Sequence, residues 1–127
     1  MKYKRILLKL SGEALTGKGK HNLDFKIIRE VAKEFAELNS QGIELAIVIG
    51  GGNIFRGRNI PKGSIDQATA DYMGMTATIM NAIALQSEIE RAGAHCRVLS
   101  ALSIKEVAED YIRRKARGHL KDGKIVK

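Results

Sequence analysis

Apolar and polar positions follow one another along the chain in a regular order that predicts strands and helices in turn. Short apolar runs at residues 5–10 and 43–49 predict two buried strands. Between them, apolar residues recur at helical spacing, so a helix is expected there. Asp24 can cap the start of that helix, and Gly42 is the glycine expected just beyond its end.

The second half of the chain continues the pattern. Residues from about 67 to 92 predict a long helix that ends at Gly93, and residues 97–99 predict a third strand. Ser103 with Glu106 forms a capping box, which predicts a helix running towards Leu120. A turn at Asp122 and Gly123 then leads into residues 124–127, which predict the start of a fourth strand.

Strands that alternate with helices of ten or more residues indicate an α/β fold, in which a parallel sheet is sandwiched between helices. Residues 1–127 are expected to form part of a single domain. The last predicted strand starts where the sequence stops, which predicts the front half of a longer protein. A sheet interrupted there would leave an unpaired edge and exposed apolar surface.

Three consecutive glycines carry the clearest chemical signal. The second predicted strand runs directly into Gly50, Gly51 and Gly52, and Arg56 follows. Glycines at the end of a strand let backbone N–H groups approach an anion closely, and a guanidinium can hold phosphate oxygens in two places. Ligands of open α/β sheets bind at the carboxyl ends of strands. The run therefore predicts a phosphate site.

A second glycine turn follows the first predicted strand, at Lys9-Leu-Ser11-Gly12. A lysine beside such a turn can neutralise a phosphoryl group in transfer, or it can be an edge-strand lysine that discourages aggregation. Two turns of this kind suggest two phosphate-bearing ligands, as in a kinase. Gly19 occupies the Ser/Thr position of a P-loop, so that motif is not predicted.

The sequence allows two interpretations of Asp71. Its carboxylate could accept hydrogen bonds from ribose hydroxyls, or it could be an acidic residue favoured near a helix start. The three histidines are scattered, so the sequence predicts no metal cluster, and Cys96 is expected to be a small buried residue.

Composition narrows the class of protein. Of the 127 residues, 44% are hydrophobic and 28% charged, and no apolar run approaches the ~20 residues of a membrane span. The N-terminus lacks a signal-peptide core, so a cytoplasmic location is expected. The net charge of +8 divides into +5 over residues 1–20, −3 over 21–110 and +6 over 111–127. The basic ends could bind a polyanion, but the sequence has six Phe and Tyr, no Trp and no RNA-binding signature, which argues against nucleic acid.

The motifs together resemble those of the bacterial uridylate kinases, which are members of the amino acid kinase superfamily. The similar segments are residues 9–15, 48–57 and 71–75. The resemblance extends over essentially the whole chain. It implies a three-layer α/β fold and transfer of the γ-phosphoryl group of ATP to UMP, with Mg²⁺. It also implies assembly into a homohexamer and a role in pyrimidine nucleotide biosynthesis.

The resemblance also implies roles for individual residues. Lys9, Ser11 and Gly12 would contact the phosphates of ATP, and Gly51 and Asp71 would bind UMP. Gly52 and Arg56 would line the phosphates between donor and acceptor. Lys9 and Arg56 would be the catalytic residues, and no protein metal ligand is expected.

Two departures from the family pattern qualify the expectation. The later Thr-Gly-Asn-Pro segment, a later aspartate and the adenine-binding half are absent from this sequence, so the 127-residue polypeptide is expected to be inactive by itself. The loop that forms a GTP effector site in the family lacks the usual glycine–aromatic–glycine pattern, and Gln86 replaces an arginine. That candidate effector loop consists of Gly17, Lys18, Gly19, Lys20, His21 and Asn22.

Two alternatives remain open from the residues. One is another kinase of the same superfamily, acting on acetylglutamate, carbamate or aspartate, against which the Asp71 segment argues. The other is a basic, non-enzymatic module that binds nucleic acid, whose affinity would fall steeply with salt.

Overall fold

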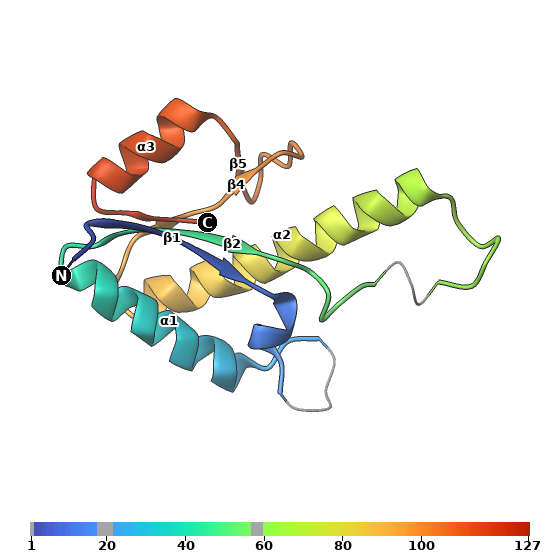
Figure 1. Cartoon of the computed structure of the whole chain (residues 1–127), viewed down its shortest axis with the longest axis horizontal. Coiled ribbons are helices and arrows are strands. Elements are labelled where there is room, and N and C mark those ends of the chain that lie inside the picture. The colour runs from blue at the N-terminus through green and yellow to red at the C-terminus, as the bar shows by residue number, and fades with distance from the viewer. Residues whose placement is uncertain (1, 18–21, 57–59) are drawn as a thin grey trace.

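The computed structural model describes residues 2–17, 22–56 and 60–127, and it shows helices on both sides of a parallel sheet. Figure 1 shows the sheet in the middle, with α1 and α2 on one side and α3 on the other. The elements are, in order, β1 (Arg5–Leu10), the short 3₁₀ helix η1 (Gly12–Leu15), α1 (Phe25–Ser40), β2 (Glu44–Ile49), α2 (Gln67–Arg91), β3 (Cys96–Arg97), β4 (Leu99–Ser100), β5 (Glu109–Asp110), α3 (Arg113–Lys121) and β6 (Ile125–Val126).

The main sheet has the strand order β1-β2-β6-β3, and every pairing in it is parallel. The register of β1 on β2 runs from Arg5 opposite Glu44 to Leu10 opposite Ile49, so both strands end at the same edge. Strands β4 and β5 form a separate parallel pair. The predicted α/β fold with a parallel sheet between helices is confirmed.

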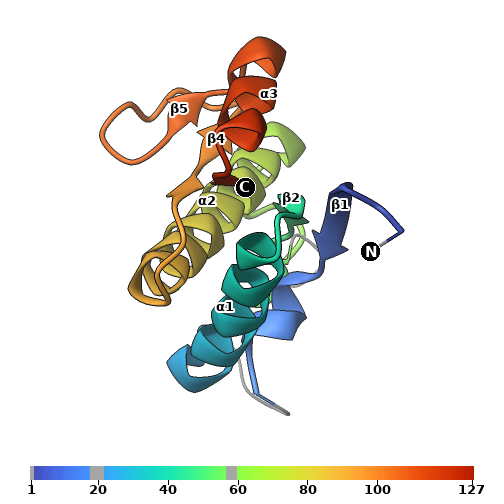
Figure 2. The ribbon, with the colours of Figure 1, turned by 90° about the vertical axis from the view of Figure 1, so that its left-hand side faces the viewer.

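The core lies between the sheet and the helices α1 and α2. Leu45, Ile47 and Ile49 point into it from β2, and Leu85 and Ile89 meet them from α2. Alternation along a strand sends successive side chains to opposite faces, which explains why every second residue of β2 is buried. Figure 2 shows α1 and α2 next to each other on the same side of β1 and β2.

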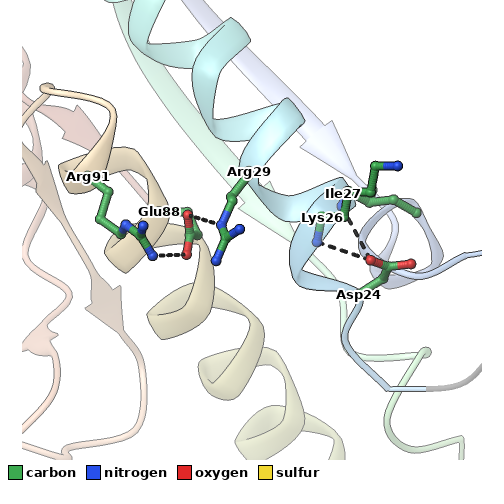
Figure 3. Close-up of polar contacts among 6 residues, drawn as sticks. All are labelled: Asp24, Lys26, Ile27, Arg29, Glu88 and Arg91. Carbon is green, nitrogen blue, oxygen red and sulfur yellow. Dashed lines mark hydrogen bonds and ion pairs between the residues drawn. The ribbon is translucent and has the colours of Figure 1, made fainter.

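Polar contacts fix the two core helices. Asp24 caps α1 as predicted, because its carboxylate accepts hydrogen bonds from the backbone N–H groups of Lys26 and Ile27 (Figure 3). Glu88 of α2, which is 7% exposed, lies between Arg29 of α1 at 3.3 Å and Arg91 at 3.5 Å. This carboxylate therefore ties α1 to α2 at their surface.

The region after β3 differs from its prediction. The expected strand at residues 97–99 is divided between β3 and β4, and the predicted helix from Ser103 is wrong over its first half. Residues 104–108 instead form a turn closed by Val107 and Ala108 N–H groups on the Ile104 carbonyl. β5 then pairs with β4, and α3 begins only at Arg113. Pairing between segments distant in sequence overrides the local capping signal here.

The last strand is not at the edge of the sheet, although the expected exposed apolar surface is present. β6 lies inside the sheet, between β2 and β3, and both its residues are buried. Exposed apolar side chains lie over β1 and β2, where Leu7 is 64% and Val48 48% exposed, and also along α2, where Met73 and Met75 are each 44% exposed. In the part of the chain that the structure describes, no helix is long and apolar enough to cross a membrane.

Candidate phosphate-binding site

The two glycine turns lie against each other at the carboxyl ends of β1 and β2. A Cβ atom on Gly12 would lie 2.9 Å from the backbone nitrogen of Gly52 and 3.0 Å from the carbonyl oxygen of Gly50. Such distances leave no room for a side chain, so glycine is required for this approach. Because β1 and β2 are parallel neighbours in register, their ends bring the turns together.

Backbone donors gather at this junction. The N–H groups of Gly12, Gly51 and Gly52 donate to no partner within the described residues, whereas the N–H groups of Ile54 and Phe55 both donate to the Gly51 carbonyl. Unpaired N–H groups on successive residues of a turn form a concave anion-binding surface. The geometry can therefore accommodate phosphate oxygens.

The turn after β2 is seated on α2. A Cβ on Gly51 would lie 2.9 Å from the Ala77 Cβ and 2.9 Å from the Thr78 backbone nitrogen. A side chain at this position would push the turn away from the helix.

Arg56 and Glu13 form an ion pair across the two turns. Glu13 belongs to η1 in the first turn and Arg56 follows the second, so the pair links the two segments. The predicted catalytic guanidinium is thus held next to Gly52, and a Cβ there would approach Arg56 Nη2 at 2.9 Å. Sequence reasoning did not identify Glu13, although an acidic residue inside a glycine turn one position after Gly12 is an available signal.

Lys9 and Ser11 flank the junction on the β1 side. Lys9 lies opposite Val48 in the sheet register, and its side chain is exposed on the side of the sheet away from α1. Ser11 precedes η1 and its carbonyl accepts the Ala14 N–H, while its side chain makes no capping hydrogen bond. Both residues are close to the turns, as their place in the sequence requires.

Asp71 lies farther away. It is exposed on α2, where it accepts a hydrogen bond from Gln67 Nε2 at 2.8 Å. Asp71 precedes Ala77 by six positions in the helix, which is about 9 Å along the helix axis. The first half of α2 extends beyond the sheet in Figure 1, and among the described residues Asp71 makes no hydrogen bond or ion pair with the glycine turns.

The candidate effector loop is only partly described. Lys18, Gly19, Lys20 and His21 lie outside the described residues. Asn22, at the end of the loop, has φ of 70° and donates its N–H to the Asn53 carbonyl at 2.8 Å. Gln86 donates to the Cys96 carbonyl at 3.1 Å, which ties α2 to β3.

Two buried asparagines support the site and were not predicted. Asn53 follows the three glycines and Asn81 lies on α2, and their side-chain amides bind each other. A polar residue on an otherwise apolar helix face, between Ala77 and Leu85, is the sequence signal that could have identified Asn81.

Other candidate chemistry is limited in the described residues. No group of three or more His, Cys, Asp or Glu side chains there could hold a metal ion. Proteins usually bind Mg²⁺ through one or two carboxylates together with waters and substrate phosphates. Glu13, the acidic side chain at the turns, is paired with Arg56, so the described residues of the turns offer Mg²⁺ no unpaired carboxylate. Cys96 is 2% exposed, and burial raises the pKa of its thiol to about 12, so it is the small buried residue expected.

Comparison with known proteins agrees with this arrangement. The model of the amino acid kinase family matches residues 4–126. A UMP kinase from Bacillus anthracis is similar in structure over 98% of this chain and 51% of its own, with 39% identity and a TM-score of 0.88. A UMP kinase from Ureaplasma parvum is similar over 99% and 53%, with 28% identity and a TM-score of 0.89. The chain thus spans about half the length of each, and it belongs to the amino acid kinase family.

Proposed function

We propose that this chain supplies the phosphate-contacting half of an ATP-dependent UMP kinase, which transfers the γ-phosphoryl group of ATP to UMP. The observation that carries the proposal is the contact of two glycine turns at the ends of neighbouring parallel strands. The similarity of this chain to two UMP kinases, at 28–39% sequence identity, supports UMP as the acceptor. Phosphotransferases make up the family, so the reaction class follows from the family and the acceptor is the proposed part.

In the proposed reaction, the turn at Ser11 and Gly12 holds the ATP phosphates and the turn at Gly51 holds UMP. Lys9 and Arg56 offset the repulsion between the two anionic ligands, and Asp71 binds the ribose of UMP. Transfer of a phosphoryl group needs positioning and electrostatic stabilisation more than covalent chemistry, so no nucleophile from the protein is required. Mg²⁺ would arrive as the MgATP substrate.

In the proposed site, Arg56 can pair either with Glu13 or with a ligand phosphate. Glu13 pairs with the Arg56 guanidinium in the structure, and a phosphate arriving between the turns would compete for the same guanidinium. We propose that phosphate binding moves Arg56 from Glu13 to the ligand. The remaining half of the kinase fold, assembly into a homohexamer and a cytoplasmic location belong to the same proposal.

The test is a chimera in which this chain replaces the matching half of the Bacillus anthracis UMP kinase. We expect UDP formation from ATP and UMP in the chimera and none from the 127-residue chain alone. Replacing Lys9 by Met in the chimera should lower kcat by about 10²–10³, the range typical for loss of one group that stabilises transition-state charge. UDP formation is followed by chromatography.

The same chimera separates the alternatives. Phosphorylation of acetylglutamate, carbamate or aspartate without phosphorylation of UMP would assign a different acceptor. A chimera that folds, as judged by circular dichroism and a cooperative unfolding transition, but turns over none of these acceptors would contradict the proposal.

A further inference from the structure

Two asparagine side chains lie buried at the base of the two glycine turns. Asn53 is 3% exposed and Asn81 is 0% exposed. Asn81 Nδ2 donates to Asn53 Oδ1 at 2.7 Å, and Asn53 Nδ2 donates back to Asn81 Oδ1 at 3.1 Å. The second hydrogens are also used, by the Gly50 carbonyl at 2.7 Å and the Asn22 carbonyl at 3.0 Å. All four amide hydrogens of the pair therefore have acceptors.

These bonds join three segments that are distant in sequence. Asn81 belongs to α2, Asn53 and Gly50 belong to the turn after β2, and Asn22 belongs to the segment before α1. The Asn22 N–H also donates to the Asn53 backbone carbonyl, so this segment is bound to the turn twice. A fully satisfied buried polar network holds its members in one geometry, because any displacement leaves a buried donor unpaired.

The first glycine turn rests directly on the pair. A Cβ on Gly12 would lie 2.4 Å from Asn53 Oδ1, the nearest atom outside Gly12 and its chain neighbours. Gly12 therefore lies against the asparagine amide on one side and against the backbone of Gly52 on the other. The pair determines how closely the first turn can approach the second.

We propose that Asn81 is a positioning residue that, through Asn53, sets the separation and orientation of the donor and acceptor phosphate turns. This inference rests on the proposed function for its catalytic meaning, and on the contacts alone for its structural meaning. Because Asp71 lies on the same helix, α2 would hold the ribose-binding residue and both phosphate turns in one frame.

The amide side chains of Asn53 and Asn81 indicate what the pair does. An apolar pair of similar volume would pack α2 against the turn without the cost of burying two amides. The amides instead bind the Gly50 and Asn22 carbonyls, which apolar side chains would leave unpaired. Their role is to fix the backbone of the turns and not only to fill space.

The first experiment measures amide hydrogen exchange by NMR in the 127-residue chain and its Asn81→Ala variant. We expect exchange to become at least about tenfold faster at hydrogen-bonded amides of both turns, as for loss of one or two buried hydrogen bonds. The reporters are the N–H groups of Ala14, Thr16, Asn22, Ile54 and Phe55. If Asn81→Ala fails to fold, Asn81→Ser, which retains one donor, replaces it.

The chain offers a matched control in Asn39. This asparagine donates from α1 to the Gly123 carbonyl at 3.0 Å and the Ile43 carbonyl at 3.4 Å, at the opposite end of the sheet from the turns. Asn39→Ala should accelerate exchange near Gly123 and leave both glycine turns unchanged. Acceleration confined to α2 in Asn81→Ala, or equal across the chain in both variants, would overturn the positioning role.

The second experiment measures UMP and ATP dissociation constants and kcat in the chimera described above. Asn81→Ala should weaken both nucleotides together and lower kcat further, by about tenfold each, whereas Asn39→Ala should change neither. Unchanged binding and kcat in a folded Asn81→Ala chimera would overturn the proposal. A parent chimera that binds neither nucleotide would contradict the proposed function, and the exchange experiment would still decide the role of Asn81 on the turns.

Discussion

The two faces of the sheet differ in how completely they are covered. On the face towards α1 and α2, Leu45, Ile47 and Ile49 are 1–3% exposed and belong to one continuous core. On the other face, α3 packs over β6 and part of β2, and the side chains over β1 and β2 remain open. Leu7 and Val48 are about half exposed or more, beside a groove of about 440 Å³.

The glycine turns are supported from the covered face of the sheet, whereas Lys9 lies on the open face. The glycine turns are held from the covered side, where Gly51 meets α2 and Asn81 binds Asn53. Lys9 shares the open side with Leu7, because side chains two residues apart in a strand point the same way. The UMP kinases that resemble this chain are about twice as long as the part matched.

The largest expected effect compares two neighbours on β2 that point to opposite faces. Ile47→Ala should lower the free energy of unfolding by about 2–5 kcal/mol, because it leaves a cavity in a core that can relax only in part. Val48→Ala should cost less than about 1 kcal/mol, because Val48 is 48% exposed. Urea unfolding followed by circular dichroism measures both.

Equal losses of unfolding free energy in Ile47→Ala and Val48→Ala would contradict the difference between the two faces. They would mean that the open face is covered in solution, for example by a second copy of the chain. A dependence of the unfolding midpoint on protein concentration would identify that case, because association stabilises the folded state by mass action.

A smaller effect compares glycines at helices on the two faces. Gly51→Ala should destabilise by about 1–3 kcal/mol, because the added methyl meets Ala77 and the backbone of Thr78 at 2.9 Å. Gly118→Ala, inside α3, should stabilise by about 0.5–1 kcal/mol, because no atom lies within 4 Å and alanine favours the helix. Thermal unfolding gives both signs, and a stabilising Gly51→Ala would contradict the tight seating of the turn.

Local signals predicted the covered side well and the open side poorly, for a physical reason. Asp24, Gly42 and the apolar spacing of α1 and α2 act within a few residues of the structure they specify. β4 and β5 have two residues each and exist only because they pair with each other. The capping box at Ser103 could not reveal that pairing, so the cap of the predicted helix lies nine residues before Ile112, the cap of α3.

The site shows the same division. Three glycines after a strand predicted a phosphate turn, because the backbone freedom of glycine is a local property. The amide pair of Asn53 and Asn81 spans 28 residues, and only the folded structure shows that the two side chains face each other. The Arg56 and Glu13 ion pair depends in the same way on the register of β1 with β2.

The smallest expected effect concerns how α3 is held on the open face. Glu109 of β5 accepts a hydrogen bond from His119 of α3 at 2.9 Å, and this contact, with help from Arg97, lowers the pKa of Glu109 below its usual 4.5. A carboxyl whose pKa is lower in the folded state contributes stability above its unfolded pKa, and the contribution is lost as pH falls through the folded pKa. Glu109→Gln should therefore cost up to about 1 kcal/mol at pH 7, as for partly exposed ion pairs, and the cost should diminish as pH falls below the usual carboxyl pKa of 4.5 towards pH 2.

Urea unfolding of the parent chain and Glu109→Gln across this pH range measures the difference. Glu106→Gln is the matched control, because Glu106 is exposed on the turn before β5 and has no ion pair among the described residues. A difference that stays constant down to pH 2 would show that Glu109 acts through packing and not through its charge. A difference that disappears would show that the charge of Glu109, through its contact with His119, helps to hold α3 on its face of the sheet.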